Sequence, residues 1–194
     1  MSLHILTNAY RTFDPWCGRP RCPIELDLGC GKGGLTLAMA ARFPDRLILG
    51  ADVMLGRLRR VQRRVQQRAL GNVELLRVDN LDLVGYQLPD GCISRLHILC
   101  PDPWPKARHH GRRLVTSDFL GKAARVLRPG GVLHLSTDEA DYIAFMQAAA
   151  APLPYFRPVE AATVLADVAD IRTEFEAQWL AQGKSVPHLA YLRQ

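Results

Sequence analysis

The segment from Pro101 to Arg113 carries the residue types in this chain that are best suited to chemistry. It runs Pro-Asp-Pro-Trp-Pro-Lys-Ala-Arg-His-His-Gly-Arg-Arg and joins one carboxylate, Asp102, to a proline frame and a cationic tail. The apolar run at 93–99 predicts a buried strand. Asp102 therefore follows a strand's carboxyl end, the edge where open α/β sheets bind ligands. The prolines fix their own φ angles and hold the residues before them extended. This arrangement suits a nucleobase beside its phosphates, and the alternative is a surface loop with a solvated charge run.

A glycine run, Gly29-Cys30-Gly31-Lys32-Gly33-Gly34, follows one apolar run and precedes a helical pattern. In that context glycines let a ligand approach the backbone closely. The spacing fits either a nicotinamide dinucleotide or S-adenosylmethionine, and Asp52 at the end of the next apolar run suits ribose hydroxyls in both cases. Asp27 favours S-adenosylmethionine, because a carboxylate attracts its sulfonium and ammonium groups and repels a pyrophosphate. A purely structural glycine turn is the remaining alternative.

The elements that must position these residues alternate along the chain. Short apolar runs predict strands at 24–28, 47–51, 73–78, 93–99 and 132–136, and helical patterns lie at 35–43, 55–70, 118–127 and 139–150. Repeated βα units predict a parallel sheet with helices on both faces. After residue 151 we expect a strand within 155–161, a helix at 173–182 and a last strand at 188–193. Residues 1–23 lack a period and predict a short irregular arm before a single domain at 24–194.

Composition bounds the class of protein. The 194 residues are 48% hydrophobic and 23% charged, which is typical of an ordinary globular domain, and the longest apolar runs are too short to span a bilayer. A net charge of +6 predicts attraction to a polyanion. Five cysteines without a C-x-x-C pair, and a start without a secretory apolar core, indicate the reducing cytoplasm. His109 and His110 have no partner at ligand spacing, so no metal site is expected.

Arginines are also concentrated in the predicted helix 55–70. Its apolar stripe comprises Leu58, Val61, Val65 and Ala69, and the remaining surface carries Arg57, Arg59, Arg60, Arg63, Arg64 and Arg68. Such a face either contacts nucleic acid or is only solvated, and the sequence leaves both open.

The chain resembles the bacterial tRNA (guanine-N7)-methyltransferases. The resemblance rests on Pro-Asp-Pro-Trp-x-Lys followed by the Arg/His run, on the glycine loop, on Thr137-Asp138 and on Thr173-Glu174-Phe175-Glu176, in that family's order. It implies a class I methyltransferase fold whose mostly parallel sheet ends in an antiparallel C-terminal edge. It also implies methyl transfer from S-adenosylmethionine to N7 of a guanine in tRNA, by a cytoplasmic monomer or homodimer.

The resemblance assigns roles to individual residues. It adds Asp79 and Asn80 to the cofactor contacts that the loop itself predicts, which are Asp27, Gly29, Gly31, Gly33 and Asp52. It implies an active-site role for Asp102 and substrate contacts from Lys106, Asp138, Thr173 and Glu176. The cations Lys106, Arg108, Arg112 and Arg113 flank Asp102 and are expected to contact phosphates. Two local alternatives stay open. Asn80 could cap a short helix, and Thr173 with Glu176 forms the pattern of a capping box. Guanine N7 already has a free lone pair, so Asp102 is expected to orient the base and stabilise charge, not to remove a proton.

The sequence departs from the family in two ways. Asp27 and Asp52 stand where glutamate is usual, which shortens the reach of each carboxylate by one methylene, and the N-terminal arm is short. The competing functions are a nonenzymatic RNA-binding protein on a methyltransferase scaffold, a methyltransferase with another substrate, and a nicotinamide oxidoreductase. Intact loop glycines and carboxylates argue against the first, the unexplained basic loop against the second, and the lack of an evident hydride-transfer acid against the third.

Overall fold

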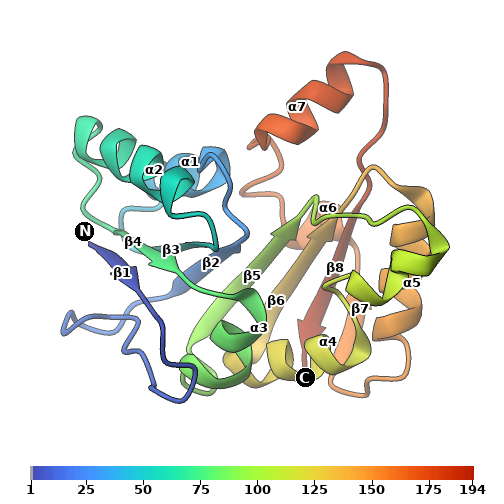
Figure 1. Cartoon of the computed structure of the whole chain (residues 1–194), viewed down its shortest axis with the longest axis horizontal. Coiled ribbons are helices and arrows are strands. Elements are labelled where there is room, and N and C mark those ends of the chain that lie inside the picture. Colours follow the sequence, from blue (N-terminus) through green and yellow to red (C-terminus); the bar gives the residue numbers. More distant parts are fainter. Residues whose placement is uncertain (1) are drawn as a thin grey trace.

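The computed structural model describes residues 2–194, which form one mixed eight-stranded sheet with helices on both faces (Figure 1). The strands are β1 (Leu3–Ile5), β2 (Ile24–Leu28), β3 (Leu47–Asp52), β4 (Val73–Arg77), β5 (Ile93–Leu99), β6 (Leu127–Ser136), β7 (Phe156–Val159) and β8 (His188–Arg193). Their order is β1-β4-β3-β2-β5-β6-β8-β7. β1 to β6 are parallel, and β8 runs antiparallel to both β6 and β7. The predicted sheet and its antiparallel C-terminal edge are confirmed.

The helices connect successive strands and cover the sheet. They are α1 (Gly34–Arg42), α2 (Leu55–Gln67), α3 (Asn80–Asp82), a π-helical turn (Leu83–Gln87), a 3-10 helix (Ala107–Arg112), α4 (Ser117–Val126), α5 (Ala140–Ala150), α6 (Ala161–Val164) and α7 (Glu174–Ala181). Side chains of α4 and α5 pack into one hydrophobic cluster, and those of α1 and α2 into another on the opposite face. α7 stands above the carboxyl edge of the parallel strands, at the top of Figure 1.

Two sequence-based expectations were wrong in detail. The arm at 1–23 is not wholly irregular, because Leu3–Ile5 pairs with Leu75–Arg77 and adds β1 to the sheet. Three residues are too few for a period to be visible in the sequence. The helix predicted to Leu70 ends at Gln67, and Ala69, expected in its buried stripe, is exposed with φ of 52°.

β2 explains how acidic residues come to lie inside the sheet. All five of its residues are buried between β3 and β5, and its sequence Ile-Glu-Leu-Asp-Leu places both carboxylates on one face. Side chains alternate along a strand, so Glu25 and Asp27 share the face covered by α1 while Ile24 and Leu26 enter the other core cluster. The buried acids at 25 and 27 therefore need partners on that face.

Candidate active site

The glycine loop between β2 and α1 has the backbone that its sequence predicts. Gly29, Gly31 and Gly33 have φ of 86°, 56° and 78°, a region that other residues rarely adopt. A Cβ built on Gly29 would meet nothing within 4 Å, and one on Gly31 would meet only the Gly29 carbonyl oxygen at 3.8 Å. The two positions therefore border open space from which a ligand can reach the backbone.

Gly33 has a different reason to be glycine. A Cβ at this position would lie 2.7 Å from both methyl groups of Val61, closer than carbon atoms approach in real proteins. Glycine at this position lets Val61 of α2 pack directly against the loop. Packing and the positive φ together account for Gly33, a residue predicted from the sequence to contact the cofactor.

Two buried carboxylates brace the loop. Asp27 accepts a hydrogen bond of 2.6 Å from the Thr36 hydroxyl of α1. Asp52, at the end of β3, accepts from the main-chain N–H of Gly31 at 3.0 Å and of Met54 at 2.7 Å. Burial first, and then the charges of these two carboxylates, raise the pKa of the Cys30 thiol well above its ordinary value. The structure thus brings the predicted acids of β2 and β3 to one loop.

The end of β4 resolves one of the open alternatives. Asp79, not Asn80, caps α3, because its carboxylate accepts from the N–H groups of Leu81 and Asp82. The side-chain carbonyl oxygen of Asn80 is buried and has no hydrogen-bond partner among residues 2–194. A buried acceptor without a donor is costly, so Asn80 suits a ligand that brings an N–H group.

The loop after β5 has a strained and cross-braced backbone. Cys100 and Trp104 adopt φ of 48° and 44° without being glycines, and the N–H of Cys100 donates to the Ser136 carbonyl. The Arg112 guanidinium lies over the Trp104 ring, 4.9 Å from its centroid, and His109 meets the ring edge-on. Asp102, Lys106, Arg108 and Arg112 are exposed. Backbone strain that is held in place by surrounding contacts is typical of functional loops. This loop presents one carboxylate and three cations to solvent.

Arg113 departs from the prediction that it contacts substrate. Its side chain is only 1% exposed, donates to the Pro103 carbonyl at 2.9 Å and to the Asp141 carboxylate at 2.7 Å, and lies over the rings of Tyr142 and Phe145. Because these contacts occupy its guanidinium, Arg113 fastens the proline loop to α5. The sequence could not separate it from its neighbour Arg112, since only burial distinguishes them.

Two predicted substrate residues, Asp138 after β6 and Glu176 of α7, act electrostatically on the thiol of Cys100. Burial, and then the carboxylates of Asp138 and Glu176, raise the pKa of the Cys100 thiol to about 11. Asp138 lies 3.8 Å from the Lys184 ammonium. Cys100 is therefore a neutral thiol at physiological pH, and the charges of acids from two distant segments act on it.

α7 separates the roles of Thr173 and Glu176. The Thr173 hydroxyl accepts from the main-chain N–H of Glu176 at 3.1 Å, so it caps the helix as the sequence pattern predicts. The buried carboxylate of Glu176 instead accepts from Arg172 at 2.9 Å and lies 3.2 Å from the His188 ring nitrogen. Capping accounts for Thr173 but not for the burial of Glu176. His188 and Arg172 were missed, because no motif marks them.

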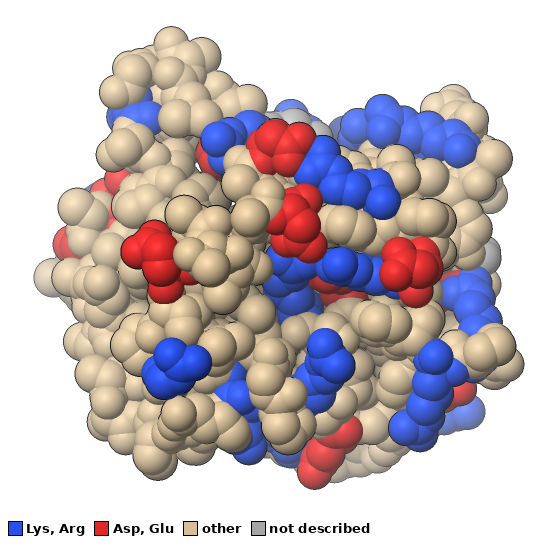
Figure 2. All heavy atoms as spheres, turned by 180° about the vertical axis from the view of Figure 1, so that it is seen from behind, with Lys and Arg blue, Asp and Glu red and all other residues tan. Residues whose placement is uncertain are grey.

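Cations extend from this edge along α2. Arg57, Arg59, Arg60, Arg63 and Arg68 are exposed, whereas Arg64 donates to the Lys32 carbonyl and braces the glycine loop. Seen from behind, Lys and Arg side chains form a band at the upper right, where α2 lies (Figure 2). This band is a positively charged surface next to the carboxyl edge of the sheet.

A group of metal-ligand types occurs elsewhere. His4, Cys17 and Glu74 bring three such atoms within 4.8 Å of one another. Glu74 already pairs with Arg19 and accepts from the Ser2 N–H, which satisfies it without a metal. All five cysteines are free thiols, and among the described residues no helix is long and apolar enough to cross a membrane.

Comparison with known proteins decides the family. Residues 21–189 match the family model described as "Putative methyltransferase". A tRNA (guanine-N(7)-)-methyltransferase of Mycobacterium avium is 34% identical over 181 residues, which is 93% of this chain and 70% of that protein. This chain belongs to the tRNA (guanine-N7)-methyltransferase family. Proteins of the same name from Nocardia farcinica and Caulobacter vibrioides are 37% and 41% identical over 77% and 61% of this chain. The chain spans only 55% and 52% of their lengths.

Solved structures support the fold of this tRNA (guanine-N7)-methyltransferase family member. The 16S rRNA methyltransferase KamB aligns with a TM-score of 0.63 at 17% identity, covering 89% of this chain and 88% of that one. An rRNA methylase from Streptococcus thermophilus aligns with a TM-score of 0.58 at 15% identity, over 89% and 87% of the two chains. At such identities the match shows the class I methyltransferase fold alone.

Proposed function

We propose that this protein transfers a methyl group from S-adenosylmethionine to N7 of a guanine in tRNA. One observation carries the proposal: the glycine loop after β2 and the cationic proline loop after β5 leave neighbouring parallel strands at the same sheet edge. β2 and β5 pair in register, with Asp27 opposite His97. A cofactor loop and an anion-attracting loop thus border one site, in a chain of this family.

The residues at this edge fit the cofactor. Asp27 offers a carboxylate for the positively charged end, Asp52 for ribose hydroxyls, and Gly29 and Gly31 leave room for close approach. The unpartnered oxygen of Asn80 suits the adenine amino group, with Asp79 beside it. When bound, S-adenosylmethionine supplies an electrophilic methyl group. Both oxygens of Asp52 already accept main-chain hydrogen bonds, so this shorter acid must share them with a ribose.

The proposed contacts with tRNA rest on the charge and the position of exposed side chains. Lys106, Arg108 and Arg112 are exposed cations for RNA phosphates, and arginine can grip a phosphate with two parallel hydrogen bonds. Asp102, held beside them by prolines, is positioned to orient the guanine and to stabilise the positive charge that appears on it. Asp138 and Glu176 add carboxylates whose charges act on the Cys100 thiol at the start of this loop. The guanine N7 lone pair is available in the neutral base, so none of these acids needs to remove a proton before attack.

The test is methyl incorporation into unmodified tRNA from isotopically labelled S-adenosylmethionine, followed by mapping of the modified nucleoside. We expect 7-methylguanosine at a single tRNA position. Methyl incorporation at another base atom, or tRNA binding by folded protein without any transfer, contradicts the proposal. The second result identifies instead a nonenzymatic RNA-binding protein.

A further inference from the structure

A continuous chain of five polar side chains crosses the sheet from β2 to α7. His97 Nε2 lies 2.9 Å from the Glu25 carboxylate, and its Nδ1 lies 2.9 Å from His134 Nδ1. His134 Nε2 lies 2.8 Å from His188 Nδ1. His188 Nε2 lies 3.2 Å from the Glu176 carboxylate. Three imidazoles therefore connect two carboxylates through four hydrogen-bond contacts, and both ring nitrogens of each histidine are engaged.

The chain follows from strand register. His97 of β5 lies directly opposite His134 of β6, and His188 stands two positions from the residue that pairs with His134 on β8. Glu25, His97 and His134 are at most 4% exposed, whereas the His188 side chain is 26% exposed. Buried polar groups of this kind must be hydrogen-bonded, so each of the four contacts requires a proton.

Counting the protons gives a definite charge state. A neutral imidazole carries one N–H, so three neutral histidines supply three protons, and ionised carboxylates supply none. Four contacts between two carboxylates need four protons. With all three histidines neutral, one contact would set two acceptors against each other. The chain is complete only with one additional proton.

The carboxylates at both ends are ionised. At the inner end burial opposes ionisation of Glu25, but hydrogen bonds from His97 and Arg95 outweigh it and hold the pKa of Glu25 well below its ordinary value. At the outer end burial is likewise outweighed by His188 and Arg172, and the pKa of Glu176 is lowered. The additional proton therefore resides on an imidazole.

Burial decides which imidazole carries it. Desolvation first, and then the charges of His97, His188 and Arg95, lower the pKa of His134 far below its ordinary value, which leaves His134 neutral. His97 has no exposed surface, whereas His188 is partly hydrated. A charged group prefers the hydrated position.

We propose that His188 is a resident imidazolium, the outer end of a proton-loaded three-histidine chain that fixes the carboxylate of Glu176 at the candidate active site. His134 and His97 are then positioning residues. His134 carries its proton on Nδ1 and donates to His97, and His97 donates through Nε2 to Glu25. The role of the chain in methyl transfer rests on the proposed function, whereas the proton count does not.

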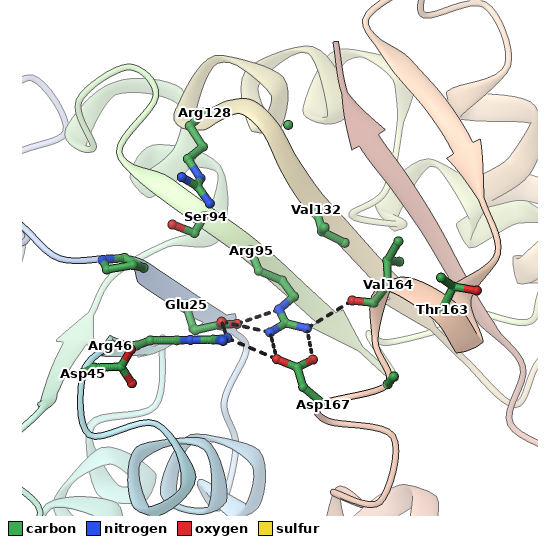
Figure 3. A pocket seen from close by; sticks show the side chains of 13 residues that line it. Glu25, Asp45, Arg46, Ser94, Arg95, Arg128, Val132, Thr163, Val164 and Asp167 are labelled. Carbon is green, nitrogen blue, oxygen red and sulfur yellow. Dashed lines mark hydrogen bonds and ion pairs between the residues drawn. The ribbon is translucent and has the colours of Figure 1, made fainter.

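Each carboxylate at the ends of the chain also pairs with arginine. Glu25 also accepts from Arg46 and Arg95, and Arg95 forms two further hydrogen bonds to Asp167. These residues line an open hollow of about 470 Å³ at the amino ends of the strands, opposite the glycine loop (Figure 3). At the other end, the charged partners of His188 and Glu176 are each other and Arg172.

A second proton arrangement keeps the same outer contacts. If both inner hydrogen bonds reverse, His97 becomes the imidazolium, His134 carries its proton on Nε2, and His188 is neutral but still donates to Glu176. Two protons each move across one hydrogen bond, and none leaves the chain. Positive charge can thus withdraw from the neighbourhood of a methylated, cationic guanine without releasing Glu176.

The test is nitrogen-15 NMR of the histidine rings in the wild-type protein without ligands at pH 8, above the ordinary histidine pKa of about 6.5. We expect both nitrogens of His188 to be protonated and His134 to be the Nδ1–H tautomer. Glu176→Gln is the matched control. Its amide can donate to His188 Nε2, so all four contacts are satisfied by neutral imidazoles. We expect His188 to become neutral and the variant to bind one proton fewer.

A neutral His188 in the folded wild-type protein at pH 8 overturns the proposal. So does an imidazolium that persists unchanged in folded Glu176→Gln. If Glu176→Gln fails to fold, Arg172→Ala provides the second variant, and His188 should then remain protonated because Glu176 is retained. None of these measurements needs methyl transfer, so absence of activity would refute the proposed function alone.

Discussion

Arg113 donates from its Nε atom to the carbonyl oxygen of Pro103, 2.9 Å away, while the adjacent Arg112 is exposed and covers Trp104. Two neighbouring arginines in one basic motif thus have opposite surroundings. One holds the proline loop from within, and the other presents its charge to solvent.

This difference predicts separate effects of alanine at the two positions. Arg113→Ala removes a buried guanidinium with two polar partners and should lower the free energy of unfolding by about 1–3 kcal/mol. Arg112→Ala should leave stability nearly unchanged and reduce the log-log salt slope of tRNA binding by about one unit. Urea titrations and binding at several salt concentrations measure both. Equal stability losses in the two variants would contradict the assignment.

The glycine loop gives a second matched pair. Gly33→Ala forces a Cβ to within 2.7 Å of the Val61 methyl groups and should cost about 1–3 kcal/mol of folding stability. Gly31→Ala meets open space, so only its φ of 56° should cost stability, about 1 kcal/mol. We expect calorimetry to find that Gly31→Ala weakens S-adenosylmethionine binding in folded protein. The stability cost of Gly33→Ala should be smaller in a Val61→Ala background than in the wild-type protein, because the methyl groups that obstruct the new Cβ are then absent. An unchanged cost would show that Val61 is not the obstacle.

Much of this organisation was accessible from sequence. The βα alternation, the glycine loop and Asp102 after β5 all rest on local patterns, because strand ends and glycine turns are encoded by neighbouring residues. The histidine chain was not accessible, since His97, His134 and His188 meet only through the register of three strands. The same holds for Arg113, whose burial depends on Asp141 and Tyr142 of α5.

The pH dependence of stability follows from His134 and Glu25. Burial depresses the pKa of His134 in the folded state. The contribution of His134 to folding stability is therefore complete above its unfolded pKa of about 6.5 and is lost as the pH falls below that value. Glu25, whose folded pKa is also depressed, contributes in full above about 4.5 and loses its contribution at lower pH. The urea midpoint should therefore fall in two stages between pH 7 and pH 3. His134→Gln should remove the first stage if it folds, and a flat wild-type midpoint from pH 7 to 5 would refute this role.

Removing the Asp102 carboxylate should slow methyl transfer and hardly change the affinity for cofactor or tRNA. Asp102→Ala removes an exposed carboxylate from the loop after β5, whereas the glycine loop and the exposed cations are left intact. Cofactor affinity and bulk tRNA affinity should therefore change little. Single-turnover methyl transfer should fall roughly 10²- to 10³-fold, the loss typical of one preorganised electrostatic contact. Asp102→Asn should retain more activity, because its amide oxygen still accepts a hydrogen bond. A wild-type rate of methyl transfer in Asp102→Ala would show that Asp102 takes no part in the reaction.

The proposed reaction requires guanine N7 to be the nucleophile at the carboxyl edge of β2 and β5. The most direct measurement compares methyl transfer to two tRNA transcripts, one ordinary and one in which every guanine is 7-deazaguanine, with carbon in place of N7. We expect both transcripts to bind with similar salt dependence, because phosphates dominate affinity, and only the ordinary transcript to accept a methyl group. Equal methyl incorporation into the 7-deazaguanine transcript would contradict it.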